Sequence, residues 1–128
     1  MKIVTVSLRH QRISPKKVRL VLDMIRGSKA EGAVSYLNSE NKKAARVLSS
    51  LVKSGISACK SKDYKESEIY ISEALCQEGK KLKRTMVGAR GRSRGYLKRM
   101  SHIKLSFSKN NLPARAGAKQ EKTDGTKS

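Results

Sequence analysis

Acidic residues are scarce in this chain. Its 128 residues include 30 Lys or Arg but only 10 Asp or Glu, for a formal net charge of +20 at pH 7. Residues 79–120 contain no acid, although 13 of them are Lys or Arg. A segment of one charge sign cannot neutralise itself, so it either extends by self-repulsion or meets a polyanion. The charge therefore indicates nucleic acid as the first class of partner and an anionic membrane as the second.

Aromatic residues and long apolar runs are also few. There is no Trp and only one Phe, so aliphatic side chains must fill the core of one small domain. No apolar run approaches the roughly 18 residues of a membrane-spanning helix, and the start of the chain alternates too early for a signal-peptide core. The basic helices lack the Trp or Phe that membrane-surface helices carry. We therefore expect no membrane partner and no secretion.

Residues that could support catalysis or bind a metal are rare and scattered. Cys59 and Cys76 match no zinc or redox spacing, and we expect both to be small buried hydrophobes. His10 and His102 are the only histidines, and their spacing suggests neither a metal pair nor a nucleophile with its base. A contact with phosphate or an RNA edge is the favoured role for both. The sequence thus predicts no enzyme, no cofactor and no metal site.

Hydrophobic periodicity predicts a strand followed by three helices. Apolar residues alternate over residues 2–9, which is typical of a half-buried strand. Ser14 followed by Pro15 predicts a capped helix start, and Gly27 a helix end. Ser28 has capping-box spacing to Glu31, which predicts a second helix. The third and longest helix is expected over residues 42–60, with Gly55 on its apolar side, where close packing is possible.

Two further strands are expected on either side of a basic segment. Residues 69–76 read as a strand although Glu73 interrupts the alternation, and residues 102–108 alternate cleanly. A structureless loop of about two dozen residues between them is improbable in a small domain. We therefore expect a basic hairpin arm at about residues 79–101. A disordered basic linker is the alternative.

The glycines and arginines of this arm suggest its chemistry. Gly88, Gly91 and Gly95 would allow the chain to turn or twist near the tip. Arg90, Arg92 and Arg94 lie within five residues, and guanidinium groups bind phosphate bidentately and stack on bases. Such arginine–glycine tracts are typical of proteins that bind RNA without reading its bases in a groove.

Three segments resemble a known family. They are RISPKKVRLVLDMIRG at residues 12–27, NKKAARVLSSLVKSGISACK at 41–60 and EGKKLKRTMVGARGRSRGYLKRMSHI at 78–103. Together they resemble the bacterial form of ribosomal large-subunit protein twenty-two, over about residues 2–109. The resemblance implies an α+β fold, with three helices packed on a small three-stranded antiparallel sheet and a long protruding basic β-hairpin. It implies one domain at residues 1–109. Beyond it, residues 110–128 are expected to form a basic, disordered tail.

The resemblance also implies a function. Its members are structural constituents of the large ribosomal subunit that bind its ribosomal RNA, aid its assembly and line the nascent-peptide exit tunnel with the hairpin tip. The implied partners are large-subunit ribosomal RNA, the nascent polypeptide and neighbouring ribosomal proteins, including the other protein of the tunnel constriction. The implied location is cytoplasmic, in the ribosome, with an organelle-encoded origin left open.

The candidate site residues are mostly cations of the first helix and of the arm. The expected RNA-binding residues are Arg9, His10, Arg12, Lys16, Lys17, Arg19, Arg26, Lys80, Lys81, Lys83, Arg84, Arg90, Arg92, Arg94, Lys98, Arg99, Ser101 and His102. By position in the family, residues 82–84 and the tip would lie near the tunnel constriction. The expected tunnel tip is Val87, Gly88, Ala89, Arg90, Gly91, Arg92 and Ser93.

The tip departs from the family pattern, and one rival function is open. The family tip typically reads Pro-Arg-Ala-x-Gly-Arg-Ala, whereas this chain lacks the proline and one arginine and adds Arg94 nearby. The rival is an architectural protein that binds DNA through its basic arm. Such proteins commonly insert an apolar wedge, often proline, at the arm tip. The proline-free tip favours the RNA interpretation.

Overall fold

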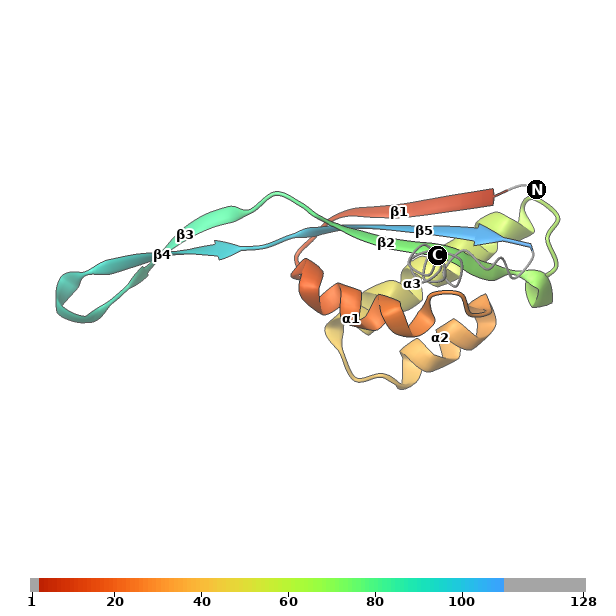
Figure 1. Ribbon diagram of the computed structural model, residues 1–128, viewed down its shortest axis with the longest axis horizontal. Helices are drawn as coiled ribbons and strands as arrows, with labels where there is room; N and C mark the ends of the chain where they lie inside the picture. The colour runs from red at the N-terminus through yellow and green to blue at the C-terminus, as the bar shows by residue number, and fades with distance from the viewer. Residues whose placement is uncertain (1–2, 110–128) are drawn as a thin grey trace, which may run out of the picture.

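A three-stranded antiparallel sheet and three helices form the body of the protein, and a separate hairpin projects from it (Figure 1). The computed structural model describes residues 3–109. The strands of the sheet lie in the order β1 (Ile3–Gln11), β5 (Ser101–Ser108) and β2 (Tyr70–Glu78), and the hairpin consists of β3 (Leu82–Val87) and β4 (Ser93–Lys98). This arrangement confirms the α+β fold that the sequence predicts. The expected tail at residues 110–128 lies outside the described residues.

The strands extend slightly beyond the predicted ranges. In the body, β1 (Ile3–Gln11), β2 (Tyr70–Glu78) and β5 (Ser101–Ser108) replace the predicted strands at residues 2–9, 69–76 and 102–108. The register of β2 against β5 shifts between Ile71 and Glu73. This irregularity explains why Glu73 interrupts the alternation: an extra residue in one strand moves the following side chains to the other face.

The helices follow the predicted apolar periodicity, and one predicted cap is wrong. They are α1 (Pro15–Ile25), α2 (Ala30–Ser39) and α3 (Lys43–Lys60). Ser14 caps α1 by accepting the backbone N–H of Lys17 at 3.4 Å. The capping box predicted at Ser28 does not form. Lys29 occupies the cap position instead, and the Ser28 hydroxyl donates to the Ile25 carbonyl at 2.7 Å.

The core lies between the inner face of the sheet and the helices, which gather on one side of it (Figure 1). Phe107 is its largest buried side chain, and the other core side chains are aliphatic except for two cysteines, as the scarcity of aromatic residues requires. Cys59 and Cys76 are both buried and unpaired, which confirms the expectation for them. Burial raises the pKa of both thiols, so they stay protonated and pack as small apolar groups.

Gly55 allows α3 to approach the sheet closely. A Cβ atom placed there would lie 2.1 Å from a ring carbon of Phe107. The predicted close packing at Gly55 is therefore confirmed, and no larger residue fits without moving the ring.

We predict that Gly55→Ala destabilises the body by about 1–3 kcal/mol, because one added methyl overfills the core against Phe107. Gly32→Ala is the matched control, since nothing lies within 4 Å of its added Cβ in α2. The control should be neutral or stabilising by up to about 1 kcal/mol through helix propensity. Thermal melts measure both. Equal stability of the two variants would contradict the packing account.

Candidate nucleic-acid interface

The arm begins at an irregular neck. The β2–β5 ladder ends with Glu78 facing Ser101, and the β3–β4 ladder begins with Leu82 facing Lys98. Three residues on one side therefore oppose two on the other, which is the count of a β-bulge. The Gly79 N–H donates to the Met100 carbonyl at 2.8 Å and keeps the two strands joined.

Glu78 is the last acid before the arm, and it is fully engaged at the neck. Its carboxylate lies 3.6 Å from the Lys81 ammonium and 3.8 Å from the Arg99 guanidinium. All three side chains are about half exposed, so these pairs contribute little to stability in water. Glu78 forms no ion pair with the cations farther along the arm, and these remain available to an external anion.

The arm strands are β3 (Leu82–Val87) and β4 (Ser93–Lys98). Across them no cation faces another cation. Lys98 faces Leu82, Arg84 faces Tyr96, Arg94 faces Met86, and Lys83 faces Leu97. Like charges directly opposite would destabilise the pair, whereas an apolar partner shields the aliphatic stem of each cation. The register thus spreads the charge so that a lone hairpin can form.

The same register gives the hairpin two unlike faces. Directly opposed residues share a face, and the faces alternate along each strand. One face, called here the basic face, carries Leu82, Arg84, Met86, Arg94, Tyr96 and Lys98. The opposite face, called here the small face, carries Lys83, Thr85, Val87, Ser93, Gly95 and Leu97. Three of the four cations in these strands therefore lie on the basic face, together with Tyr96, the only aromatic ring of the two strands.

The tip turns through two left-handed residues. Arg90 has φ 58° and Gly91 φ 73°, within the turn at Ala89–Gly91. The Gly88 N–H donates to the Arg92 carbonyl at 2.5 Å and closes the turn. A Cβ at Gly88 would meet that carbonyl oxygen at 3.0 Å. Two of the three glycines expected to help the chain turn therefore do so. The third, Gly95, lies within β4 and faces Thr85.

On the body, Arg9, His10 and His102 meet where β1 and β5 approach the arm. His10 has φ 57°, beside a register irregularity between Leu8 and Gln11. Its backbone N–H donates to Nδ1 of His102 at 3.0 Å, and the two rings meet edge to face with centroids 4.8 Å apart. Desolvation lowers the pKa of His102, and the charges of Arg9 and His10 lower it further. The ring is therefore neutral at pH 7, with its proton on Nε2.

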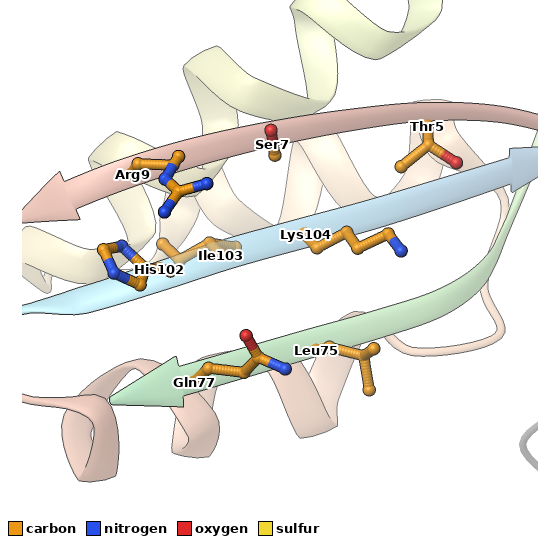
Figure 2. Close-up of a pocket in the computed structure, with 8 residues that line it drawn as sticks. All are labelled: Thr5, Ser7, Arg9, Leu75, Gln77, His102, Ile103 and Lys104. Carbon is orange, nitrogen blue, oxygen red and sulfur yellow. The ribbon is translucent and has the colours of Figure 1, made fainter. Parts of the chain in front are cut away.

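The outer face of the sheet, away from the helices, is polar and basic (Figure 2). A hollow of about 250 Å³ lies on it. Arg9 of β1 and His102 of β5 stand side by side at one end, and Lys104 projects farther along β5. The lining residues are Thr5, Ser7, Arg9, Leu75, Gln77, His102, Ile103 and Lys104. Arg9 and His102 are among the residues predicted from sequence, whereas Lys104 is not, although its alternation with buried neighbours in β5 could have identified it.

Three of the predicted RNA-binding residues have roles inside the protein. The Arg19 guanidinium donates to the Cys76 carbonyl at 3.0 and 3.3 Å. The Arg26 guanidinium donates to the Ala74 carbonyl at 2.8 Å and to the Asp23 carboxylate at 2.5 Å. Ser101 is fully buried. RNA contact by these three residues stays a prediction.

The two arginines complete the cover of the β2 edge. Farther along that edge, the Gly27 N–H donates to the Ile71 carbonyl and the Ala30 N–H to the Ile69 carbonyl, both at 3.0 Å. Beyond the register shift between Ile71 and Glu73, Arg26 donates to the Ala74 carbonyl and Arg19 to the Cys76 carbonyl, which are the next two carbonyls on this edge. An edge strand with free carbonyls invites pairing with another chain, and this cover prevents it.

The other predicted cations are exposed, as Arg19 also is despite its hydrogen bonds. They lie at the end of β1, in the first turn of α1 and along the arm, and they include Arg12, Lys16, Lys17, Lys80, Lys83, Arg84, Arg90, Arg92, Arg94 and Lys98. Among the described residues, no group of three or more His, Cys, Asp or Glu side chains could hold a metal ion. No helix in that part of the chain is long and apolar enough to cross a membrane.

Comparison with known proteins identifies this architecture. The family model for Ribosomal protein L22p/L17e matches residues 6–108, which include the three helices, the arm and all of the sheet except the first three residues of β1. This chain belongs to the L22p/L17e family. Membership gives it a structural role in the large ribosomal subunit, with ribosomal RNA and ribosomal proteins as partners. The L22p/L17e family is not enzymatic, which agrees with the prediction from its histidines and acids.

We predict that Arg26→Gln destabilises the body by about 1–3 kcal/mol, because it leaves the Ala74 carbonyl without its charged donor. The Arg26 side chain is only 28% exposed, so water replaces its guanidinium poorly. Lys16→Gln removes the same charge from an exposed position on the same helix and should change stability by less than about 0.5 kcal/mol. Chemical denaturation measures both. A neutral Arg26→Gln would contradict the structural role.

Proposed function

We propose that the chain binds large-subunit ribosomal RNA chiefly through the basic face of the arm and the outer face of the sheet. The observation that carries the proposal is the cross-strand register, which gathers Arg84, Arg94 and Lys98 on one face beside Tyr96. Guanidinium groups and an aromatic ring on one surface suit irregular RNA, whose phosphates they neutralise and whose exposed bases stack on the ring. Glu78 sits at the neck and offers these cations no internal partner.

We further propose that the tip lines the nascent-peptide exit tunnel, beside the other protein of the constriction, and that the arm aids assembly of the surrounding RNA. Family membership supports this, and so does the shape of the arm, which projects well clear of the body (Figure 1). Six residues per strand at about 3.3 Å each span roughly 20 Å before the turn is added. The small face, with Thr85, Ser93 and Gly95, is the side suited to a passing polypeptide, because it offers little charge to retain one.

The RNA proposal predicts a steep dependence of affinity on salt. With about ten phosphate contacts, the log–log slope should be near −7, at about −0.7 per phosphate of single-stranded or irregular RNA. Replacing Arg84, Arg94 and Lys98 together with Gln should reduce the magnitude of that slope by about 2. Filter binding to large-subunit ribosomal RNA over a range of salt measures it.

The matched control removes three cations from the body instead. Lys53, Lys62 and Lys65 are exposed and lie far along the chain from the arm. Their replacement with Gln lowers the net charge equally and should leave the slope within about 0.5 of the wild-type value. Equal slopes for the two triple variants would contradict the role of the basic face. Tighter binding of the wild type to duplex DNA than to ribosomal RNA would instead favour the architectural rival.

The tunnel proposal predicts a separate effect at the tip. Arg90→Ala with Arg92→Ala should leave the melting temperature of the free protein nearly unchanged, because both side chains are exposed and contact no acid. In ribosomes, the double variant should alter subunit assembly or the positions of nascent-chain stalling. Subunit sedimentation and ribosome profiling measure these. Normal assembly with an unchanged stalling pattern would show that the tip arginines are passive.

A further inference from the structure

A second cavity lies on the body, on the side of the sheet where the helices gather. It measures about 470 Å³ and opens where the link from β1 to α1, the α1 helix itself and the start of α3 come together. This volume lies within the range of small-ligand sites. The lining residues are Arg12, Ile13, Ser14, Lys17, Leu20, Lys42, Lys43 and Ala44.

Half of these lining residues are cations. Arg12 and Lys17 come from the α1 side, and Lys42 and Lys43 from the α3 side. Within residues 3–109 none of their side chains makes a hydrogen bond or ion pair. No acid lines the cavity. Four exposed, unpaired positive charges around one hollow give it a positive potential, so the cavity is complementary to a ligand with negative charge.

The walls between the cations are apolar. Ile13 and Ala44 are buried, whereas Leu20 is 59% exposed and presents its side chain to the cavity side of α1. Leu20 is one of the few large apolar side chains of the body that remain uncovered. The ligand must therefore combine an apolar surface with negative charges close to it. A nucleotide has both, because a base has apolar faces and its phosphates carry the charge.

We propose that this cavity binds one unstacked nucleotide of the large-subunit ribosomal RNA. The base lies against Leu20 and Ile13, and the adjoining phosphates meet Lys17 and Lys42 with their neighbours. Bases splayed out of loops and bulges are the usual targets of RNA-binding proteins. This inference rests on the proposed RNA binding and adds to it a site on the body that holds a base as well as phosphates.

Leu20 and Met24 provide a matched pair of variants for the test. They lie one turn apart on α1 and are 59% and 61% exposed, but only Leu20 lines the cavity. Leu20→Glu and Met24→Glu make the same change of net charge. In filter binding of the full-length chain to large-subunit ribosomal RNA, Leu20→Glu should weaken affinity at least tenfold and Met24→Glu less than threefold. Both variants should have the melting temperature of the wild type. If either Glu variant unfolds, Leu20→Gln and Met24→Gln replace the two Glu variants in the same measurement.

Ultraviolet crosslinking of the wild-type complex supplies a second measurement. Mass spectrometry should find a nucleotide attached within residues 12–20 or 42–44, and Leu20→Glu should abolish that adduct while Met24→Glu keeps it. Equal losses of affinity for the two variants, or no adduct in these segments, would overturn the nucleotide site while the wild type still binds RNA. An adduct to a large-subunit protein there would also overturn it. Failure of the wild type to prefer ribosomal RNA over DNA would refute the proposed function itself.

Discussion

The pairing of β2 with β5 is the interaction on which the rest of the structure depends. These strands continue through the neck into β3 and β4, so their register fixes which arm residues oppose one another. The same pairing sets the inner face of the sheet, against which α1 and α3 pack. It also leaves the far edge of β2 to be covered by residues 26–30 and by Arg19. One ladder thus determines the core, the edge and the charged faces of the arm.

The chain manages its charge by placing cations in three different settings. The guanidinium groups of Arg19 and Arg26 donate hydrogen bonds to backbone carbonyls of β2. The cations of the arm strands each face an apolar or aromatic side chain across the ladder, which separates like charges. Several exposed cations of the body surround a hollow near the start of α1 or lie on the outer face of the sheet. A net charge of +20 is compatible with a folded body because little of it is concentrated within the core.

Much of the fold could be predicted from the sequence because its strongest signals are periodic. The alternation in β5, the apolar side of α3 and the Ser14–Pro15 start of α1 each reflect a local rule, and each is confirmed. Gly55 was identified because it lies on the apolar side of α3, although its partner Phe107 could not be named from sequence. The cap expected at Ser28 failed because residues 27–30 bond to the backbone of Ile69 and Ile71, and this tertiary contact, which leaves Lys29 extended before α2, overrides the local pattern. The candidate site was less predictable. The sequence does not distinguish Arg19 and Arg26 from the other cations, because their bonds to the β2 carbonyls depend on the tertiary fold. The two faces of the arm likewise follow only from the cross-strand register.

The position of β1 has a consequence for the order in which the chain folds. Ile3 pairs with Ser108, so β1 finds its partner β5 only when nearly the whole described chain exists. Contacts this distant in sequence are slow to form, whereas the β3–β4 hairpin joins neighbours and can close early. During synthesis the arm therefore has a folded form available to it before the sheet of the body is complete. Until β5 arrives, β1 has no strand beside it, and its unpaired backbone edge is open to association with other chains during this interval.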